Sequence, residues 1–330
     1  MRIAFRADGS PTMGTGHVMR CVTLAAAARE LGHDPMLVIN ATGVEWLEDY
    51  ISETGLPVTR VNANELTVDQ FAGFDPDRVL IDSYVYSDAA IESVAKTVRT
   101  AVIVDFNTRT AAAAMYIDPN LGGIAREPHT AEWLVGSDYA MIRPAILEQR
   151  ADEGHRFDEQ QPHVLVFVGG SDPLGLTTTV VRAVATEVPG ATITAVGGES
   201  VRAELDADTI ADHVTVVSPG QQLPRLMGDA DVIVCAAGTS AWDVSAIGTP
   251  AVFLGIVDNQ MVSVEQIRQH DLGPVIDARG MSAEELGSEV RAGVREILSD
   301  SQLRAERVNR MTNLFDGRGA ERIVTALCGD

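Results

Sequence analysis

The sequence predicts an α/β fold of two domains, each built on a parallel sheet. Three observations support this prediction. The chain has 330 residues, which is more than a single hydrophobic core usually serves. Short apolar segments alternate with segments of helical periodicity along its whole length. The apolar segments are continuous rather than alternating, which is typical of parallel strands covered by helices on both faces.

The N-terminal domain is expected at residues 1–150. It begins with an apolar strand at 3–5, a loop with three glycines and a helix that starts at His17. The further expected elements of this half are, in order, strand 35–39, helix 44–52, strands 58–61 and 79–82, helix 90–99, and strands 101–105 and 115–118. Residues 148–162 are polar and show no periodicity, so the linker is expected there.

The C-terminal domain is expected at residues 160–330 and repeats the alternation. Its expected strands are 164–168, 191–196, 214–217, 231–235 and 250–254. Its expected helices are 177–187, 223–228, 241–247, 263–270, 282–298 and 301–315.

The formal net charge of −22 restricts the possible partners. Binding to nucleic acid or to an anionic membrane needs clustered Lys and Arg, and Lys96 is the only lysine. The three cysteines are far apart, which argues against a disulfide framework or a zinc site and suits a reducing cytoplasm. We therefore expect a cytoplasmic protein that binds a small molecule, with neither nucleic acid nor membrane as a partner.

The loop before His17 predicts an anion-binding site. A helix N-terminus presents free backbone N–H groups and the positive end of the helix dipole. Gly14 and Gly16 let the backbone approach a ligand closely. The dipole disfavours an imidazolium at His17, so a neutral imidazole acting as a base is plausible. The alternative is that the glycines only make a tight turn, since they do not form a dinucleotide fingerprint.

Polar side chains follow several of the expected strands. In open α/β sheets, ligands bind at the carboxyl ends of the strands. The residues expected to converge there with His17 are Asp82, Tyr84, Asp105, Asn107 and Asn120. For each of them taken alone, the simpler explanation is that Asp or Asn at this point caps a helix or stabilises a turn.

Two loops in the C-terminal half have the composition of phosphate sites. Gly169–Gly170–Ser171 and Gly238–Thr239–Ser240 each follow a buried strand and precede a helix. Asp243 lies in the first turn of the second of these helices, where it would bind a ribose diol or only complement the helix dipole.

The stretch Arg6–Cys21 resembles the R-A-D-x-S-x-x-x-G-x-G-H-x-x-R-C signature of a family of UDP-sugar hydrolases. These enzymes release 2,4-diacetamido-2,4,6-trideoxy-L-altrose in pseudaminic acid biosynthesis. They are related to the SpsG type of spore-coat polysaccharide proteins and to MurG-like glycosyltransferases. Further segments match in the same order along the full chain: Asp82–Tyr84, Asp118–Leu121, Tyr139–Pro144, Gly169–Pro173, Gly238–Asp243, Asp258–Gln260 and Asp316–Ala320.

The resemblance implies a GT-B fold, with two Rossmann-like domains facing across a cleft and the last helix packing back on the N-terminal domain. It implies inverting hydrolysis of the anomeric bond to UDP, with neither metal nor other cofactor. His17 matches the histidine that activates or orients water, and Asn259 and Tyr84 match further active-site residues. The expected substrate- and nucleotide-binding residues are Asp8, Gly14, Gly16, Arg20, Asn107, Gly170, Ser171, Gly238, Thr239, Ser240, Asp243 and Gln260.

Two other functions fit the same residues. The first is a GT-B glycosyltransferase that passes the sugar to an acceptor rather than to water. The second is a nucleotide-sugar-binding protein without catalytic activity. Turnover of a nucleotide sugar without an acceptor would indicate the hydrolase, and binding without turnover would indicate the inactive protein.

Overall fold

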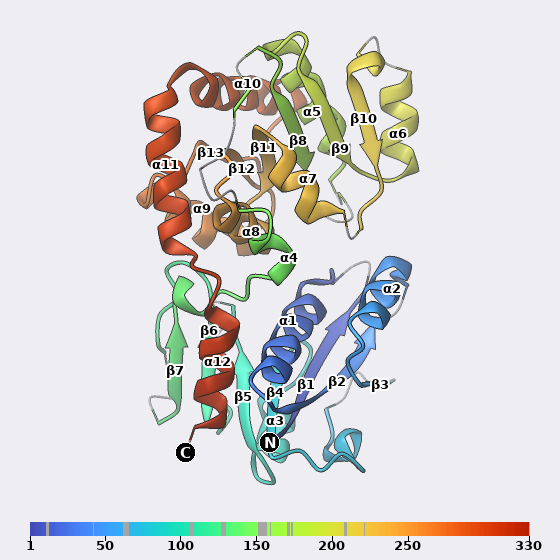
Figure 1. Ribbon diagram of the computed structural model, residues 1–330, viewed down its shortest axis with the longest axis vertical. Helices are drawn as coiled ribbons and strands as arrows, with labels where there is room; N and C mark the ends of the chain where they lie inside the picture. The colour runs from blue at the N-terminus through green and yellow to red at the C-terminus, as the bar shows by residue number, and fades with distance from the viewer. Residues whose placement is uncertain are drawn as a thin grey trace. The chain divides into compact units, whose positions relative to one another are not determined.

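The computed structural model describes residues 1–10, 13–41, 43–61, 66–105, 109–126, 130–150, 157–158, 160–169, 172, 174–207, 210–220 and 222–329. The chain forms two compact units (Figure 1). Unit 1 is Met1–Ile142 together with Gly317–Asp330, and unit 2 is Arg143–Asp316. The division thus lies just before the polar segment 148–162 in which the sequence predicts the linker. No helix among the described residues has both the length and the apolar composition that crossing a membrane requires.

Unit 1 is built on a parallel sheet with the strand order β3-β2-β1-β4-β5-β6-β7. The strands are β1 Arg2–Gly9, β2 Asp34–Ala41, β3 Val58–Arg60, β4 Arg78–Asp82, β5 Arg99–Ile103, β6 Met115–Asp118 and β7 Glu132–Val135. The helices are α1 Gly16–Glu30, α2 Glu45–Glu53, η1 Val68–Phe71, α3 Asp88–Ala95, η2 Ser137–Tyr139 and α12 Gly319–Cys328.

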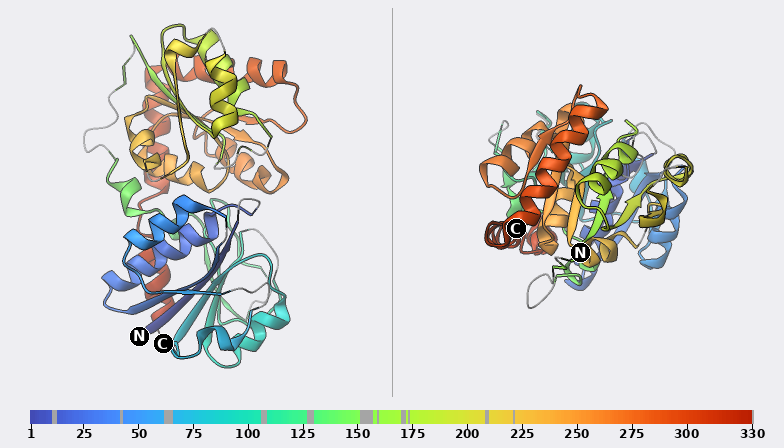
Figure 2. Two further views of the ribbon diagram at one scale, coloured as in Figure 1. Left: turned by 90° about the vertical axis from the view of Figure 1, so that its right-hand side faces the viewer. Right: turned by 90° about the horizontal axis from the view of Figure 1, so that it is seen from above.

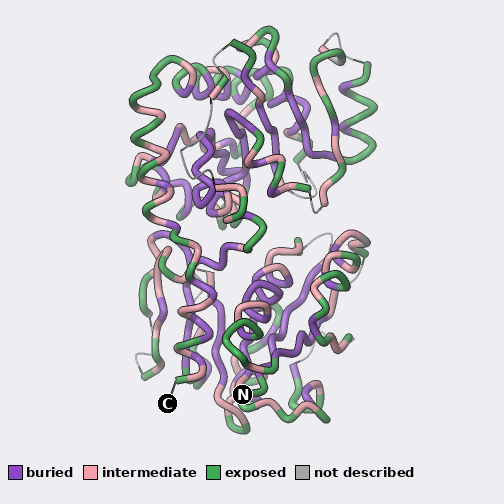
Figure 3. The backbone as a smooth tube through the Cα atoms, viewed as in Figure 1, coloured by how far each residue is buried: buried purple, intermediate pink, exposed green. Residues whose placement is uncertain are grey.

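Central strand β1 shows why this sheet needs cover on both faces. Ile3, Phe5 and Ala7 pack into a core with α1, α2 and α12, while Ala4 packs into a second core with residues of α3 and η1. The two helical layers are visible on opposite faces of the sheet in Figure 2, left. The strands between the two edge strands, β2, β1, β4, β5 and β6, are buried along most of their length (Figure 3). The continuous apolar strands predicted from the sequence are therefore explained by burial on both faces.

Unit 2 repeats this architecture with the strand order β10-β9-β8-β11-β12-β13. The strands are β8 His163–Phe167, β9 Thr192–Val196, β10 Val214–Val217, β11 Val232–Ala236, β12 Ala251–Gly255 and β13 Val275–Asp277. The helices are α4 Pro144–Leu147, α5 Thr177–Glu187, α6 Glu199–Asp206, η3 Ala211–His213, α7 Leu223–Asp229, α8 Thr239–Ile247, η4 Asp258–Gln260, α9 Met261–Gln269, α10 Ala283–Ser299 and α11 Ser301–Leu314.

The strand order places a switch point in each sheet. In unit 1 the chain turns from β1 to β2 on one side and later to β4 on the other; in unit 2 it does the same from β8 to β9 and β11. Loops that leave the carboxyl ends of the two strands at such a point diverge, and the crevice between them is where open α/β sheets bind ligands. The loop to α1 and the end of β4 lie at this point of unit 1.

Helix α12 closes unit 1, although it is the last helix of the chain. It packs along α1 and beside η2. The approach is close at its first residue, because a Cβ added at Gly319 would lie 2.1 Å from the carbonyl oxygen of Ala140. Glycine at this position lets the helix start against the backbone of residues 139–140.

Candidate functional site

The loop from β1 to α1 is a closed turn that delivers His17 to the carboxyl edge of the unit 1 sheet. Ser10 and Gly14 pair through two backbone hydrogen bonds, and Gly14 has a φ of +85°. Helix α1 begins at Gly16, and the side chain of its N-cap residue, Thr15, makes no capping hydrogen bond. His17 is therefore in the first turn, where backbone N–H groups lack intrahelical acceptors.

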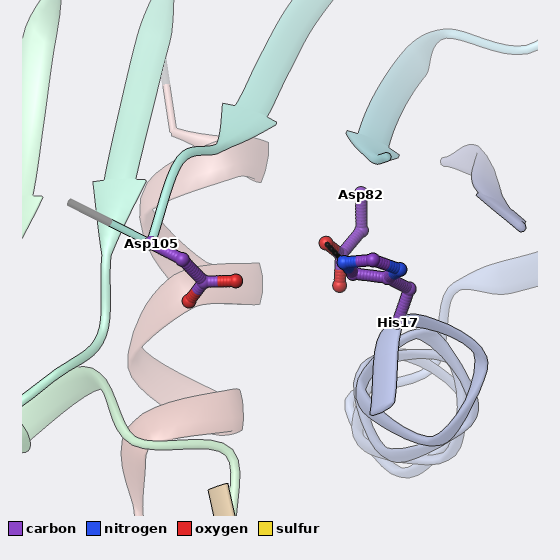
Figure 4. A group of neighbouring side chains, drawn as sticks. All are labelled: His17, Asp82 and Asp105. Carbon is purple, nitrogen blue, oxygen red and sulfur yellow. Dashed lines mark ion pairs between the residues drawn. The ribbon is translucent and has the colours of Figure 1, made fainter. Parts of the chain in front are cut away.

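His17 is enclosed by two side chains from the end of β4 and the loop after it. Its Nε2 lies 4.0 Å from Oδ1 of Asp82, the last residue of β4 (Figure 4). The ring of Tyr84 packs against the imidazole edge-to-face, with ring centroids 4.4 Å apart. His17 is 5% exposed, and its Nδ1 has no hydrogen-bond partner among the described residues. The imidazole thus has a carboxylate at one nitrogen and an unused second nitrogen.

Arg20, one turn further along α1, joins the two carboxylates at this edge. Its Nε and Nη2 donate to Asp82, both at 2.8 Å, and its Nη1 and Nη2 donate to Asp105, both at 2.6 Å. Arg20 is 8% exposed, so these are buried, charge-assisted hydrogen bonds. The guanidinium fixes both carboxylates relative to His17.

Asp105, which follows β5, is held from three directions. Besides Arg20, it accepts from the Tyr84 hydroxyl at 2.6 Å and from Nδ2 of Asn120 at 2.9 Å. Its φ is +33°, a backbone conformation that is costly outside glycine. Such strain persists only where surrounding contacts impose it, and it is concentrated at functional sites. Figure 4 shows the Asp105 carboxylate turned toward His17 and Asp82.

The ionisation of these groups follows from burial and from Arg20. Burial raises the pKa of Asp82, against the lowering effect of Arg20. Burial also acts to raise the pKa of Asp105, but Arg20, Tyr84 and Asn120 outweigh it and hold that pKa below its usual value. Partial burial and the neighbouring Asp105 raise the pKa of the Tyr84 hydroxyl. Asp105 is thus the carboxylate that stays ionised, and Tyr84 is its protonated donor.

The ligand atoms of His17, Asp82 and Asp105 lie within 4.8 Å of one another, which is a spacing that suits a metal ion. However, Arg20 donates to both oxygens of each carboxylate. A cation bound there would have to displace a buried guanidinium that already neutralises the pair. The donor set therefore fits a fixed ion-pair network better than a metal site.

Asp8 belongs to a neighbouring cluster beneath the loop. It accepts from Nη2 of Arg6 at 2.9 Å, and Arg6 lies over the ring of Tyr86. Both charged residues are almost fully buried. The structure thus brings together His17, Arg20 and Tyr84 of the expected site, and it places Asp8 in a separate ion pair that supports the strand.

In unit 2, Gly238 and Gln260 come together at the carboxyl ends of β11 and β12. Gly238 is the N-cap of α8 and has no side chain to cap that helix, and Thr239 and Ser240 begin its first turn. A Cβ added at Gly238 would lie 3.4 Å from Nε2 of Gln260, whose Oε1 accepts from the Ile256 amide. The N-terminal end of α8 has the free backbone N–H groups that bind anions.

Two further residues expected in this unit, Asp243 and Asn259, have different surroundings. Asp243 accepts from Arg143 at 3.1 Å, and burial raises the pKa of its carboxyl despite this partner. Asn259 is exposed on η4, and its neighbour Asp258 is ion-paired with Arg279 at 2.6 Å. Arg143 therefore joins the expected set through Asp243.

Three expected binding residues, Asn107, Gly170 and Ser171, lie outside the described residues. Asp172, which follows two of them in sequence, accepts from the amides of Leu176 and Thr177 at 2.9 and 3.0 Å. It therefore has the ordinary role of capping the start of α5.

Two arginines at these sites have no role in the sequence-based prediction. Arg143 falls inside the matched segment Tyr139–Pro144, so that match contained a signal for it. Arg109 follows no strand directly and belongs to none of the matched segments, and only its contacts in the structure reveal it.

No family model matches the chain. Two relatives match along the sequence. The spore coat polysaccharide biosynthesis protein SpsG of Bacillus subtilis is 24% identical, over 99% of this chain and 98% of that protein. An uncharacterized protein of Methanocaldococcus jannaschii, MJ1062, is 23% identical over 90% of this chain. The match spans 65% of the length of MJ1062, so that relative extends well beyond it.

Solved structures match over 99% of the chain. The glycotransferase of kitacinnamycin has a TM-score of 0.69, 16% identity and 97% coverage, and MurG of Acinetobacter baumannii has 0.62, 16% and 99%. The chain has the GT-B fold. A third match, the Streptomyces glycosyltransferase SsfS6 complexed with thymidine diphosphate, has a TM-score of 0.60, 15% identity and 99% coverage. Two of these neighbours, the kitacinnamycin protein and SsfS6, are named as transferases, and none of the three is named as a hydrolase.

Proposed function

We propose that this chain is a GT-B glycosyltransferase that moves a sugar from a nucleoside diphosphate to an acceptor hydroxyl. The geometry around His17 carries the proposal: a buried imidazole with a carboxylate beside Nε2 and an unused Nδ1. The names of the structural neighbours favour transfer over hydrolysis. SpsG, named for polysaccharide biosynthesis, is consistent with a sugar substrate.

In the proposed reaction, Nε2–H of His17 faces Asp82 and Nδ1 takes the proton of the acceptor hydroxyl. The acceptor oxygen then forms a bond to the anomeric carbon, and the bond from that carbon to the diphosphate oxygen breaks. The diphosphate leaves with the electron pair. Asp82 orients the imidazole and stabilises its charged form, a contribution of the kind that makes general base catalysis worth roughly 10²–10⁴-fold.

Unit 2 is proposed to bind the nucleotide. The N-terminus of α8, with Gly238, Thr239 and Ser240, offers backbone donors to the diphosphate. Gln260 on η4 lies beside Gly238, and Asn259 precedes it on the same 3-10 helix. Asp243 is proposed to contact the ribose. Four of the five N–H donors of Arg20 are engaged by Asp82 and Asp105, so its proposed role is to hold those carboxylates rather than to bind substrate.

Hydrolysis is the second candidate, and the signature Arg6–Cys21 favours it. Water would then take the place of the acceptor hydroxyl at Nδ1 of His17. The diacetamido-trideoxy sugar of the pseudaminic acid pathway is the substrate that this resemblance suggests. The same residues serve both reactions, so the acceptor decides between them.

The test is release of nucleoside diphosphate from a panel of UDP- and TDP-linked sugars in ¹⁸O-water, with EDTA, and with or without a set of neutral alcohol and phenol acceptors. Transfer of the sugar to an acceptor supports the proposal. Free sugar with ¹⁸O at the anomeric carbon, at a rate that acceptors do not change, would replace it by hydrolysis. If the protein neither turned over nor bound any nucleotide sugar, both candidates would fail.

A further inference from the structure

The segment that carries Tyr84 leaves the sheet after Asp82, so its carbonyl groups need donors from elsewhere. Arg109 supplies them. Its Nη1 donates to the carbonyl oxygen of Tyr86 at 2.6 Å, and its Nη2 lies 3.4 Å from the carbonyl oxygens of both Ser83 and Tyr84. One guanidinium thus bonds to three carbonyls of the segment 83–86.

A second set of contacts anchors the same two chain segments to each other. Asp88, at the start of α3, accepts from the amide and the hydroxyl of Thr110 at 2.8 and 2.6 Å, and from Nη1 of Arg109 at 3.3 Å. The Arg109 side chain is 15% exposed. Residues 109–110 therefore hold the segment 83–88 in place through hydrogen bonds.

The segment 83–88 carries Tyr84, whose side chain contacts two residues of the site. The Tyr84 ring packs on His17 at 4.4 Å between centroids, and its hydroxyl donates to Oδ2 of Asp105 at 2.6 Å. Tyr84 is 43% exposed, so these two contacts cover only part of its side chain. Its position depends on its backbone, and that backbone is bonded to Arg109.

We propose that Arg109 is a positioning residue that acts through Tyr84 on His17 and Asp105. The planar guanidinium can reach several carbonyls and a carboxylate at once, which a lysine ammonium on a flexible stem cannot reproduce. Without the guanidinium the segment 83–86 loses these hydrogen bonds, and the Tyr84 ring then moves away from the imidazole. The effect on catalysis rests on the proposed function, whereas the effect on His17 does not.

A double-mutant cycle tests the route through Tyr84. Arg109→Gln is expected to lower kcat for sugar transfer about 10-fold with little change in KM, as for hydrogen-bonded neighbours that couple. In a Tyr84→Ala background the same substitution should cost less than about 2-fold, because the residue it positions is gone. If Arg109→Gln lowered kcat by the same factor in the wild-type and Tyr84→Ala backgrounds, the proposal would be overturned.

Nuclear magnetic resonance of the His17 ring tests the inference without turnover. The ring current of Tyr84 acts on the imidazole that it contacts, so Arg109→Gln should shift the His17 ring signals toward those of Tyr84→Ala. Arg60→Gln is the matched control, since Arg60 forms an exposed ion pair with Glu48 in the same unit and should leave the signals unchanged.

The two failures are distinguishable. A wild-type protein that turns over no nucleotide sugar refutes the proposed function, and His17 signals unmoved in folded Arg109→Gln refute the positioning role. If Arg109→Gln does not fold, Arg109→Lys keeps the charge and takes its place. Signals in that variant that stay at wild-type positions would equally overturn the inference.

Discussion

Replacement of Arg20 by leucine should strongly destabilise unit 1. Arg20 makes four hydrogen bonds to two carboxylates, and Arg20 and Asp82 are almost fully buried. Removal of the cation leaves the two buried carboxylates without the guanidinium that neutralises them, although Asp105 keeps its hydrogen bonds from Tyr84 and Asn120. Breaking a buried ion pair in this way costs about 3–5 kcal/mol of unfolding free energy. At about 2–4 °C per kcal/mol for a unit of this size, the melting temperature should fall by about 6–20 °C.

The deficit should also depend on pH. With Arg20 present, the pKa of Asp105 in the folded protein lies below its unfolded value of about 4. Its contribution to stability is therefore complete above pH ~4 and is lost as the pH falls through the folded pKa. Without Arg20, burial raises the folded pKa of both carboxyls. A carboxyl with a raised folded pKa costs stability at high pH, and the cost fades as the pH falls. The difference between variant and wild type should therefore be larger at pH 7 than at pH 5.

Denaturant unfolding followed by tryptophan fluorescence measures this effect. A Trp242→Phe background removes the tryptophan of unit 2, so that Trp46 and Trp133 report on unit 1. Arg60→Leu, which breaks an exposed pair, is the control and should cost less than about 1 kcal/mol. An Arg20→Leu variant within about 1 kcal/mol of wild type at pH 7, or a deficit that grows on acidification, would refute the reasoning.

Three further predictions concern other parts of the chain. Asn259→Ala should lower kcat more than it raises KM in a nucleotide-release assay; an effect on KM alone would make Asn259 a binding residue only. Gly319→Ala should cost about 1–3 kcal/mol in thermal unfolding, because its Cβ would lie 2.1 Å from the Ala140 oxygen. Gly287→Ala in α10, whose Cβ would lie no closer than 3.5 Å to the side chains around it, is the control and should cost nothing. Burial raises the pKa of Cys235 to about 12, so iodoacetamide at pH 8 should leave it unmodified in the folded protein, as mass spectrometry would show.

The fold was largely predictable because its strands are apolar on both faces. Strands such as β8 and β11 match the expected ranges within a residue at each end. Strand β7, Glu132–Val135, is a short edge strand that is only partly buried, and it lacks the continuous apolar run of the others. Helix α6 is polar, and β13 has three residues, too few for a periodic pattern. These three elements, β7, α6 and β13, are therefore absent from the elements expected from the sequence.

The site was predictable to the extent that parallel strands end at one edge. This rule places Asp82, Tyr84, Asp105, Asn107 and Asn120 at the edge that carries His17. In the structure Asp82 and Tyr84 contact His17, Asp105 and Asn120 join them through hydrogen bonds, and Asn107 lies outside the described residues. Their partners were not predictable. Nothing in the spacing of residues shows that Arg20 faces two carboxylates 62 and 85 positions away.

The supporting contacts of the loops were not predictable for the same reason. Arg109 bonds to carbonyl groups, which carry no sequence signal. Asp243 sits where a ribose contact is expected, yet in the structure it is paired with Arg143. Side-chain direction and long-range partners decide such roles, and local sequence patterns record neither.

The central claim is that Nδ1 of His17 takes the proton of the attacking hydroxyl. The most direct test compares wild type and His17→Gln for nucleoside diphosphate release, together with the affinity of each for the free nucleoside diphosphate. The account predicts that the rate falls by roughly 10²–10⁴-fold while nucleotide affinity stays unchanged. Full activity in the variant, or a loss that is matched by loss of nucleotide binding, would contradict it.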